Sequence, residues 1–388
     1  MDRRNFLRTV GGASAAGMLM PPAADAEGLG LNLNTKHAIV ILNGNGNRKK
    51  EFYENPEMSP NITKLAKESF VYTEDANNTV SNHGNSWTEL LTGNSIQSGV
   101  PLFPTMPHYI RKQMGDQATN YWYLQGISYY RGWRYNVKYF TSHPEYGVDT
   151  RPISMTSGQI FYERQKKHPG EIVAEEFPDM GLTASERSKL EQFIGDTLSS
   201  GDYMPNLKNK PIPRTPFWEE AQALYLLPKI FKEFKPRVMF YQQVGHDTGH
   251  GSGGLLRDET GFFEYSQVIR STDEAIGEII RFVKNDPYFS KNTAIIIRPE
   301  FGRDDEINLY GEIHHSEGYY YCYRSASIWN GPDFKPGVSD VVVNRLDFAP
   351  TVAAVFNAPA PYSDGQVRDQ LWAPHVGYKG KYTPYTPV

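Results

Sequence analysis

Short apolar runs that end in polar loops recur along this chain, and they constrain its fold more than any other feature. Three such runs, 37–42, 238–241 and 293–297, are continuous rather than alternating, which is typical of strands buried on both faces of a sheet. Helical patterns at 217–234 and 265–283 precede the second and third runs. We therefore predict an α/β fold, with a largely parallel central sheet and helices on both faces.

Less regular stretches surround this pattern. A tyrosine-rich run over 319–329 predicts a buried strand that contains the single cysteine, Cys322. A lone cysteine excludes an intrachain disulfide, and we interpret Cys322 as a core residue rather than a nucleophile. We interpret roughly 115–215 as an insertion around a common core, within one α/β domain over 27–388. Its aromatic stretch, 122–140, is expected to pack in the core and rim, with stacking on a sugar ring or covering the site as the alternatives.

The N-terminus has the ordered features of an export signal. A twin-arginine pair, Arg3 and Arg4, is followed by a mild apolar stretch, a proline pair and small residues that end at Ala26. An ordinary basic N-terminus does not explain these features in this order. The apolar stretch is too short for a stable membrane anchor. We predict a twin-arginine signal peptide over 1–26, removed near Ala26, and a periplasmic or secreted protein.

Composition narrows the class of partner. Hydrophobic residues make up 39% of the 388 residues and charged residues 22%, so the mature chain is expected to be globular. The formal net charge is −4 and no block of Lys and Arg stands out. Nucleic acid is not an expected partner, because its binding requires clustered positive charge.

Four segments, in the same order along the chain, resemble the alkaline phosphatase superfamily, nearest its sulfatase-like branch. They are 39–44 with the Pro-Asn-Ile step of 59–66, the Leu-Leu-Thr-Gly step of 90–93 with 99–101, 273–277 with 292–296, and 347–354. Each segment alone is a weak signal. Together they imply the fold of that superfamily, whereas activity depends on the residues of the site.

The resemblance also implies where a site would lie. Superfamily members hold one or two divalent metals beside a Ser, Thr or modified Cys nucleophile. Position by position, Asn43 stands where the family has its first Asp, His83 stands at the nucleophile, and Glu300-Phe301 stands at an Asp-His pair. The remaining candidate ligands are His246, Asp247 and His250 in the loop after the second apolar run, and His314 or His315.

These residue types can provide strong ligands for one metal ion rather than two. Neutral imidazole and a carboxylate are good zinc ligands, whereas Asn43 and Phe301 are poor replacements for Asp and His. The expected cofactor is a divalent metal, zinc before others, with one ion rather than two. His83 is a candidate ligand, general base or structural residue, and Arg303 is a candidate for binding an anionic group, with a surface salt bridge as the alternative.

The function that follows is a sulfatase-like metallohydrolase of a phosphate or sulfate ester, acting on a small molecule or a glycan. Asn43 and His83 would line its catalytic pocket. The alternative is a catalytically inactive superfamily member that serves as an exported binding or structural protein. A transferase or mutase is a third possibility, and the missing Ser or Thr nucleophile argues against it.

Overall fold

The structure of the 388-residue chain is a computed structural model. It describes residues 28–43, 46–76, 83–95, 103–115, 117–125, 144–146, 153–156, 182–199, 217–243, 259–303, 315 and 320–386. The predicted signal peptide, 1–26, lies outside these ranges.

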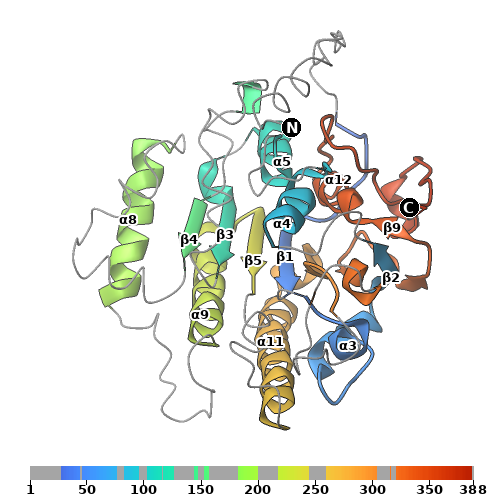
Figure 1. The fold of residues 1–388 in the computed structure, drawn as a ribbon. Coiled ribbons are helices and arrows are strands. Elements are labelled where there is room, and N and C mark those ends of the chain that lie inside the picture. The colour runs from blue at the N-terminus through green and yellow to red at the C-terminus, as the bar shows by residue number, and fades with distance from the viewer. Residues whose placement is uncertain are drawn as a thin grey trace, which may run out of the picture.

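In the described part of the chain, a nine-stranded mixed sheet forms the centre of the molecule (Figure 1). Along the chain its strands are β1 (His37–Asn43), β2 (Phe70–Ala76), β3 (Tyr121–Gln125), β4 (Ile153–Thr156), β5 (Val238–Gln242), β6 (Thr293–Pro299), β7 (Arg324–Asn330), β8 (Gly337–Ser339) and β9 (Val343–Asn344). Across the sheet the order is β4-β3-β5-β1-β6-β7-β2-β8, and β9 pairs with β2.

Helices connect these strands. The α-helices are α2 (Lys49–Phe52), α3 (Pro60–Ala66), α4 (His83–Thr92), α5 (Met106–Met114), α8 (Ala184–Ser199), α9 (Phe217–Phe234), α11 (Glu259–Asn285) and α12 (Phe348–Ala354). Short 3₁₀ helices are η1 (Ala118–Asn120), η4 (Pro144–Tyr146), η7 (Phe289–Lys291), η8 (Tyr320–Tyr323), η9 (Arg345–Asp347) and η10 (Pro374–Val376).

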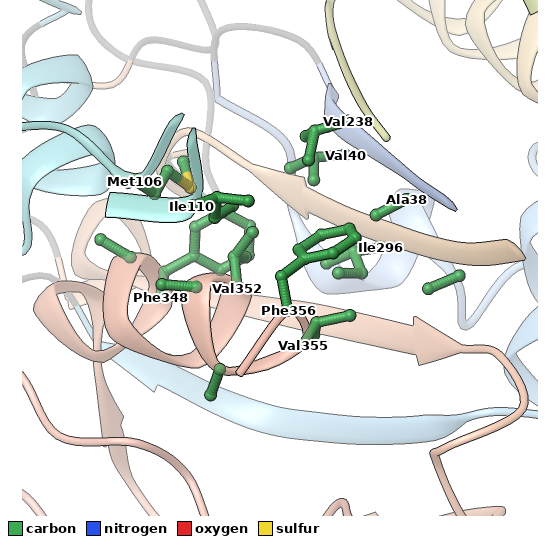
Figure 2. Packing of buried hydrophobic residues seen from close by; sticks show 14 of the residues in the cluster. Ala38, Val40, Met106, Ile110, Val238, Ile296, Phe348, Val352, Val355 and Phe356 are labelled. Carbon is green, nitrogen blue, oxygen red and sulfur yellow. The ribbon is translucent and has the colours of Figure 1, made fainter. Parts of the chain in front are cut away.

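The central strands bury both faces, which explains their continuous apolar runs. In β1, Val40 belongs to the core shared with α4, α5 and α12, whereas Ile39 and Ile41 belong to the core shared with α3, α9 and α11. Figure 2 shows Val352 of α12, and Phe356 just after that helix, beside the strand residues of the first core. A fully buried side chain of this size stabilises the fold by about 1.5–3 kcal/mol, so the two layers hold the sheet from both sides.

Helix α3 has its N-terminus capped from another part of the chain. Pro60 stands in its first turn, and the side chain of the N-cap residue, Ser59, caps no backbone group. Instead the carboxylate of Asp273, in α11, accepts hydrogen bonds from the backbone N–H groups of Asn61 at 3.1 Å and Ile62 at 2.8 Å. This contact satisfies donors that a helix start leaves open, and it joins α3 to α11.

The fold prediction is confirmed in class, with two local corrections. Strands β1, β5 and β6 are parallel neighbours as expected, but β7 is antiparallel to both β6 and β2. The strand predicted over 319–329 is wrong in its first part, because Tyr320–Tyr323 form a 3₁₀ helix and the strand begins at Arg324. Cys322 is nevertheless fully buried, in agreement with a core role.

Part of the segment interpreted as an insertion contributes to the main sheet. Residues 121–125 form β3, which pairs with β5 over five residues, and 153–156 form β4 beside it. The aromatic residues Trp122 and Tyr123 are therefore core residues, and 126–143 lie outside the described ranges. The boundaries of the insertion stay a prediction. None of the helices in the described part of the chain combines the length and apolar character that a bilayer crossing requires.

Candidate functional site

Three central strands bring the candidate residues to one edge of the sheet. In the register of β1 with β5, Leu42 lies opposite Gln242, and in that of β1 with β6, Asn43 lies opposite Pro299. The turn that begins at Glu300 therefore starts beside Asn43. Carboxyl ends of parallel strands are where α/β folds place ligands, so this edge is the candidate site.

Two carboxamides at this edge are buried with open acceptor atoms. Asn43 is 1% exposed and Gln243 is fully buried. Neither Asn43 Oδ1 nor Gln243 Oε1 has a hydrogen-bond partner in the described part of the chain. Gln243 donates its Nε2 to the carbonyl of Thr272, in α11, at 3.3 Å, and Asn43 lies on the same face by strand alternation. A buried acceptor without a partner destabilises a fold by about 1–3 kcal/mol. Such acceptors are unusual in folded proteins unless a ligand or a water molecule donates a hydrogen bond to them.

The position of the family's Asp-His pair is filled by a carboxylate and an aromatic ring. Glu300 and Phe301 are both fully buried. The ring of Phe301 lies against that of His315, with 4.5 Å between centroids. Gly46 has a φ of +82° and packs so closely that a Cβ there would lie 2.8 Å from the Phe301 ring. Phe301 is thus held in place from both sides, and it has no atom that can bind a metal.

The two arginines near Glu300 are buried, which excludes a surface salt bridge for either. Arg298 and Arg303 are both fully buried. Arg298 pairs with the carboxylate of Asp75, with 2.9 Å between Nη2 and Oδ1. Its charge is therefore balanced inside the fold. The role of Arg303 in binding an anion stays a prediction.

A buried ion-pair network, which the sequence analysis did not identify, supports this edge from the α12 side. Asp75 pairs with Arg298 and also with Arg368, with 2.8 Å between Oδ2 and Nη2. Burial alone would raise the pKa of Asp75, but the two guanidinium groups outweigh it, so that pKa lies below its ordinary value. A charged residue at the end of an otherwise apolar run, as at Arg298, is the only sequence signal that could have indicated this network.

Helix α4, which begins at His83, is joined to the same region. Arg345 pairs with the buried carboxylate of Glu89 and donates a hydrogen bond from Nη1 to Ser86 Oγ at 2.6 Å. Both Ser86 and Glu89 belong to α4. The helix start that carries His83 is therefore anchored to η9 by a fully buried contact.

The predicted site residues are only partly described. Asn43, Glu300 and His315 converge on one edge through the register of β1 with β6 and the contact of His315 with Phe301. For His83 only the backbone, as the first residue of α4, is described. His246, Asp247, His250 and His314 lie outside the described ranges. Within those ranges, no three His, Cys, Asp or Glu side chains form a group that could hold a metal.

Comparison with known proteins matches this chain at the level of its fold. No protein-family model matches the sequence, and no curated protein matches it. Among solved structures, wild-type alkaline phosphatase PafA superposes with a TM-score of 0.58 at 8% identity, over 87% of this chain and 99% of PafA. The chain has an alkaline-phosphatase-like fold. Ps i-CgsB in complex with k-i-k-neocarrahexaose superposes with a TM-score of 0.50 at 15% identity, over 86% of this chain and 75% of that protein.

This likeness confirms the resemblance at the level of the fold. At 8% and 15% identity, it carries no statement about activity, because one fold supports many chemistries. The function of this alkaline-phosphatase-like chain has to be argued from its own residues.

Proposed function

We propose that this chain is an exported, sulfatase-like metallohydrolase of a phosphate or sulfate ester. The observation that carries the proposal is the convergence at the carboxyl edge of the sheet. Asn43 lies opposite Pro299, which directly precedes the buried Glu300, and His315 lies against Phe301. His246, Asp247 and His250 follow β5 closely in the sequence.

The residues fit one metal position better than two. The strong ligands would be His246 or Asp247, His250, and His314 or His315, with Glu300 as a carboxylate ligand. The second position would have only neutral Asn43 and the apolar ring of Phe301. Imidazole ligands favour zinc, and a bound zinc ion would lower the pKa of a coordinated water and stabilise charge on the transferred group.

The other side chains would act on the substrate. Arg303, fully buried beside the Glu300 turn, would pair with the anionic group of the ester. His83, at the start of α4, would be a ligand or general base. Ps i-CgsB was crystallised with a carrageenan oligosaccharide, and a glycan ester is the corresponding substrate class here, beside small-molecule esters. Export by the twin-arginine route would place this activity in the periplasm or outside the cell.

One observation is equally compatible with the alternative, an exported binding protein without catalytic activity. The buried ring of Phe301 lies against His315 at 4.5 Å between centroids. In this arrangement a candidate ligand packs against an aromatic ring, which suits a structural histidine as well as a metal-binding one.

Metal content and hydrolysis together test the proposal. We expect the exported protein from its native host to contain a stoichiometric divalent metal by elemental analysis and to hydrolyse aryl phosphate or aryl sulfate esters. The variant His250→Ala should lose both. The matched control is His375→Gln, because His375 is a partly exposed histidine that bonds to Asp333 near the C-terminus, away from this edge. Metal-free native protein without turnover would favour the binding protein. Turnover that survives in His250→Ala would contradict the proposed metal site.

A further inference from the structure

A buried guanidinium supports the turn that carries Glu300. Arg298 donates hydrogen bonds from Nη1 to the carbonyl oxygens of Pro299 at 2.6 Å and Glu300 at 3.0 Å. Its Nη2 donates to Asp75 Oδ1 at 2.9 Å. Arg298 and Asp75 are both fully buried. One planar group therefore joins the turn after β6 to strand β2.

The end of β6 explains why such a group is needed. Pro299 is the last residue of the strand and has no backbone N–H, so the regular ladder stops there. The carbonyl groups of Pro299 and Glu300 then lie in a buried region, where an acceptor without a partner is costly. The fork of an arginine can satisfy both carbonyls and a carboxylate at once, which the single ammonium of a lysine does with poorer geometry.

We infer that Arg298 is a positioning residue for the candidate site: it orients the Glu300 turn, and Asp75 holds Arg298 in place. The inference rests on the proposed role of Glu300 as a metal ligand. Arg298 is not placed as a ligand or substrate contact, and its effect on the site would pass through Glu300. Replacing a partner that orients a metal ligand typically weakens metal binding by about 10- to 100-fold.

The chain offers a matched control in Arg368. This arginine pairs with the same carboxylate, Asp75, and is also fully buried. It donates instead to Ser327 Oγ at 2.9 Å and to the carbonyl of Asn344 at 3.1 Å, away from the Glu300 turn. Replacing either arginine by methionine leaves Asp75 with one arginine, so the two variants have the same charge balance.

The experiment measures zinc affinity and local hydrogen exchange on the full mature chain. Zinc is titrated into metal-stripped wild type, Arg298→Met, Arg298→Lys and Arg368→Met, each checked for folding by circular dichroism. We expect about tenfold weaker zinc binding or more in both Arg298 variants and wild-type affinity in Arg368→Met. The amide of Gly302, bonded to the carbonyl of Cys322 at 3.1 Å, should exchange faster only in the Arg298 variants.

A double-variant cycle tests whether the effect passes through Glu300. If it does, Glu300→Gln with Arg298→Met weakens zinc binding no further than Glu300→Gln alone. Additive losses would overturn the inference, as would equal losses in Arg298→Met and Arg368→Met. If wild type binds no zinc, the proposed function fails, and hydrogen exchange decides the positioning by itself. Equal exchange at Gly302 in the two methionine variants would then overturn it.

Discussion

Two buried polar regions of this fold differ in whether their side chains have partners. On the α12 side, Asp75 is paired with two arginines and Glu89 with Arg345, so each carboxylate faces a positive charge. On the α11 side, Asn43 and Gln243 present buried carboxamide oxygens without partners in the described part of the chain. Buried charges require such partners, whereas open acceptors at the carboxyl end of a sheet are typical of a place where a ligand binds.

The largest expected effect comes from removing the charge that the network shares. Asp75→Asn leaves two buried guanidinium groups without their common carboxylate. We expect it to lower the free energy of unfolding by about 3–5 kcal/mol, because an uncompensated buried charge is strongly destabilising. Urea denaturation measures this loss. The control is Glu68→Gln, whose partner Lys284 is largely exposed, and which should cost about 1 kcal/mol or less.

A second variant pair tests whether the α4 anchor is an ion pair or a packing contact. Arg345→Met alone should cost about 3 kcal/mol, because it leaves Glu89 buried without its partner. Adding Glu89→Leu should recover more than 1 kcal/mol of that loss, since two apolar side chains fill a buried site without a charge. Thermal and urea unfolding of the three proteins measure the coupling. A double variant no more stable than Arg345→Met would show that packing decides this contact.

The pH dependence of stability should show the same network. Since the folded pKa of Asp75 lies below its ordinary value, its contribution is complete above about pH 3.9 and is lost as pH falls through the folded pKa. Burial raises the pKa of Asp273 and Asp347, so these groups act in the opposite direction. The difference in the free energy of unfolding between wild type and Asp75→Asn therefore reports the contribution of Asp75 alone. We expect this difference to shrink below pH 4. A constant difference down to pH 2 would contradict the ion pair.

The smallest effect is expected on the α11 side. Asn43→Val removes an acceptor that has no partner among the described residues, and valine suits a strand. We expect a change in the free energy of unfolding within about 1 kcal/mol of zero for metal-free protein, because the lost Oδ1 accepts no hydrogen bond from the described residues. A loss above about 2 kcal/mol would show that the folded protein satisfies Asn43, and the contrast between the two regions would then disappear.

More of the secondary structure than of the candidate site could be predicted from the sequence. The boundaries of α9 agree with the predicted 217–234, and β1, β5 and β6 lie on the three apolar runs. These elements follow from local periodicity and burial. The direction of β7 was not predicted, because an apolar run is the same for a parallel and an antiparallel strand. At the site, Asn43 and Glu300 were identified from the family pattern, whereas Gln243 and the role of Arg298 were not.

The sequence by itself determined the class of fold, because continuous apolar runs alternating with helical patterns have few compact solutions. Only the tertiary structure decided which charges are buried together. Asp75 and Arg298 are 223 residues apart in the chain, and Ser86 and Arg345 are 259 apart. No local pattern encodes such pairs. Whether an arginine lies on the surface or inside depends on the desolvation and the partner that the folded chain provides.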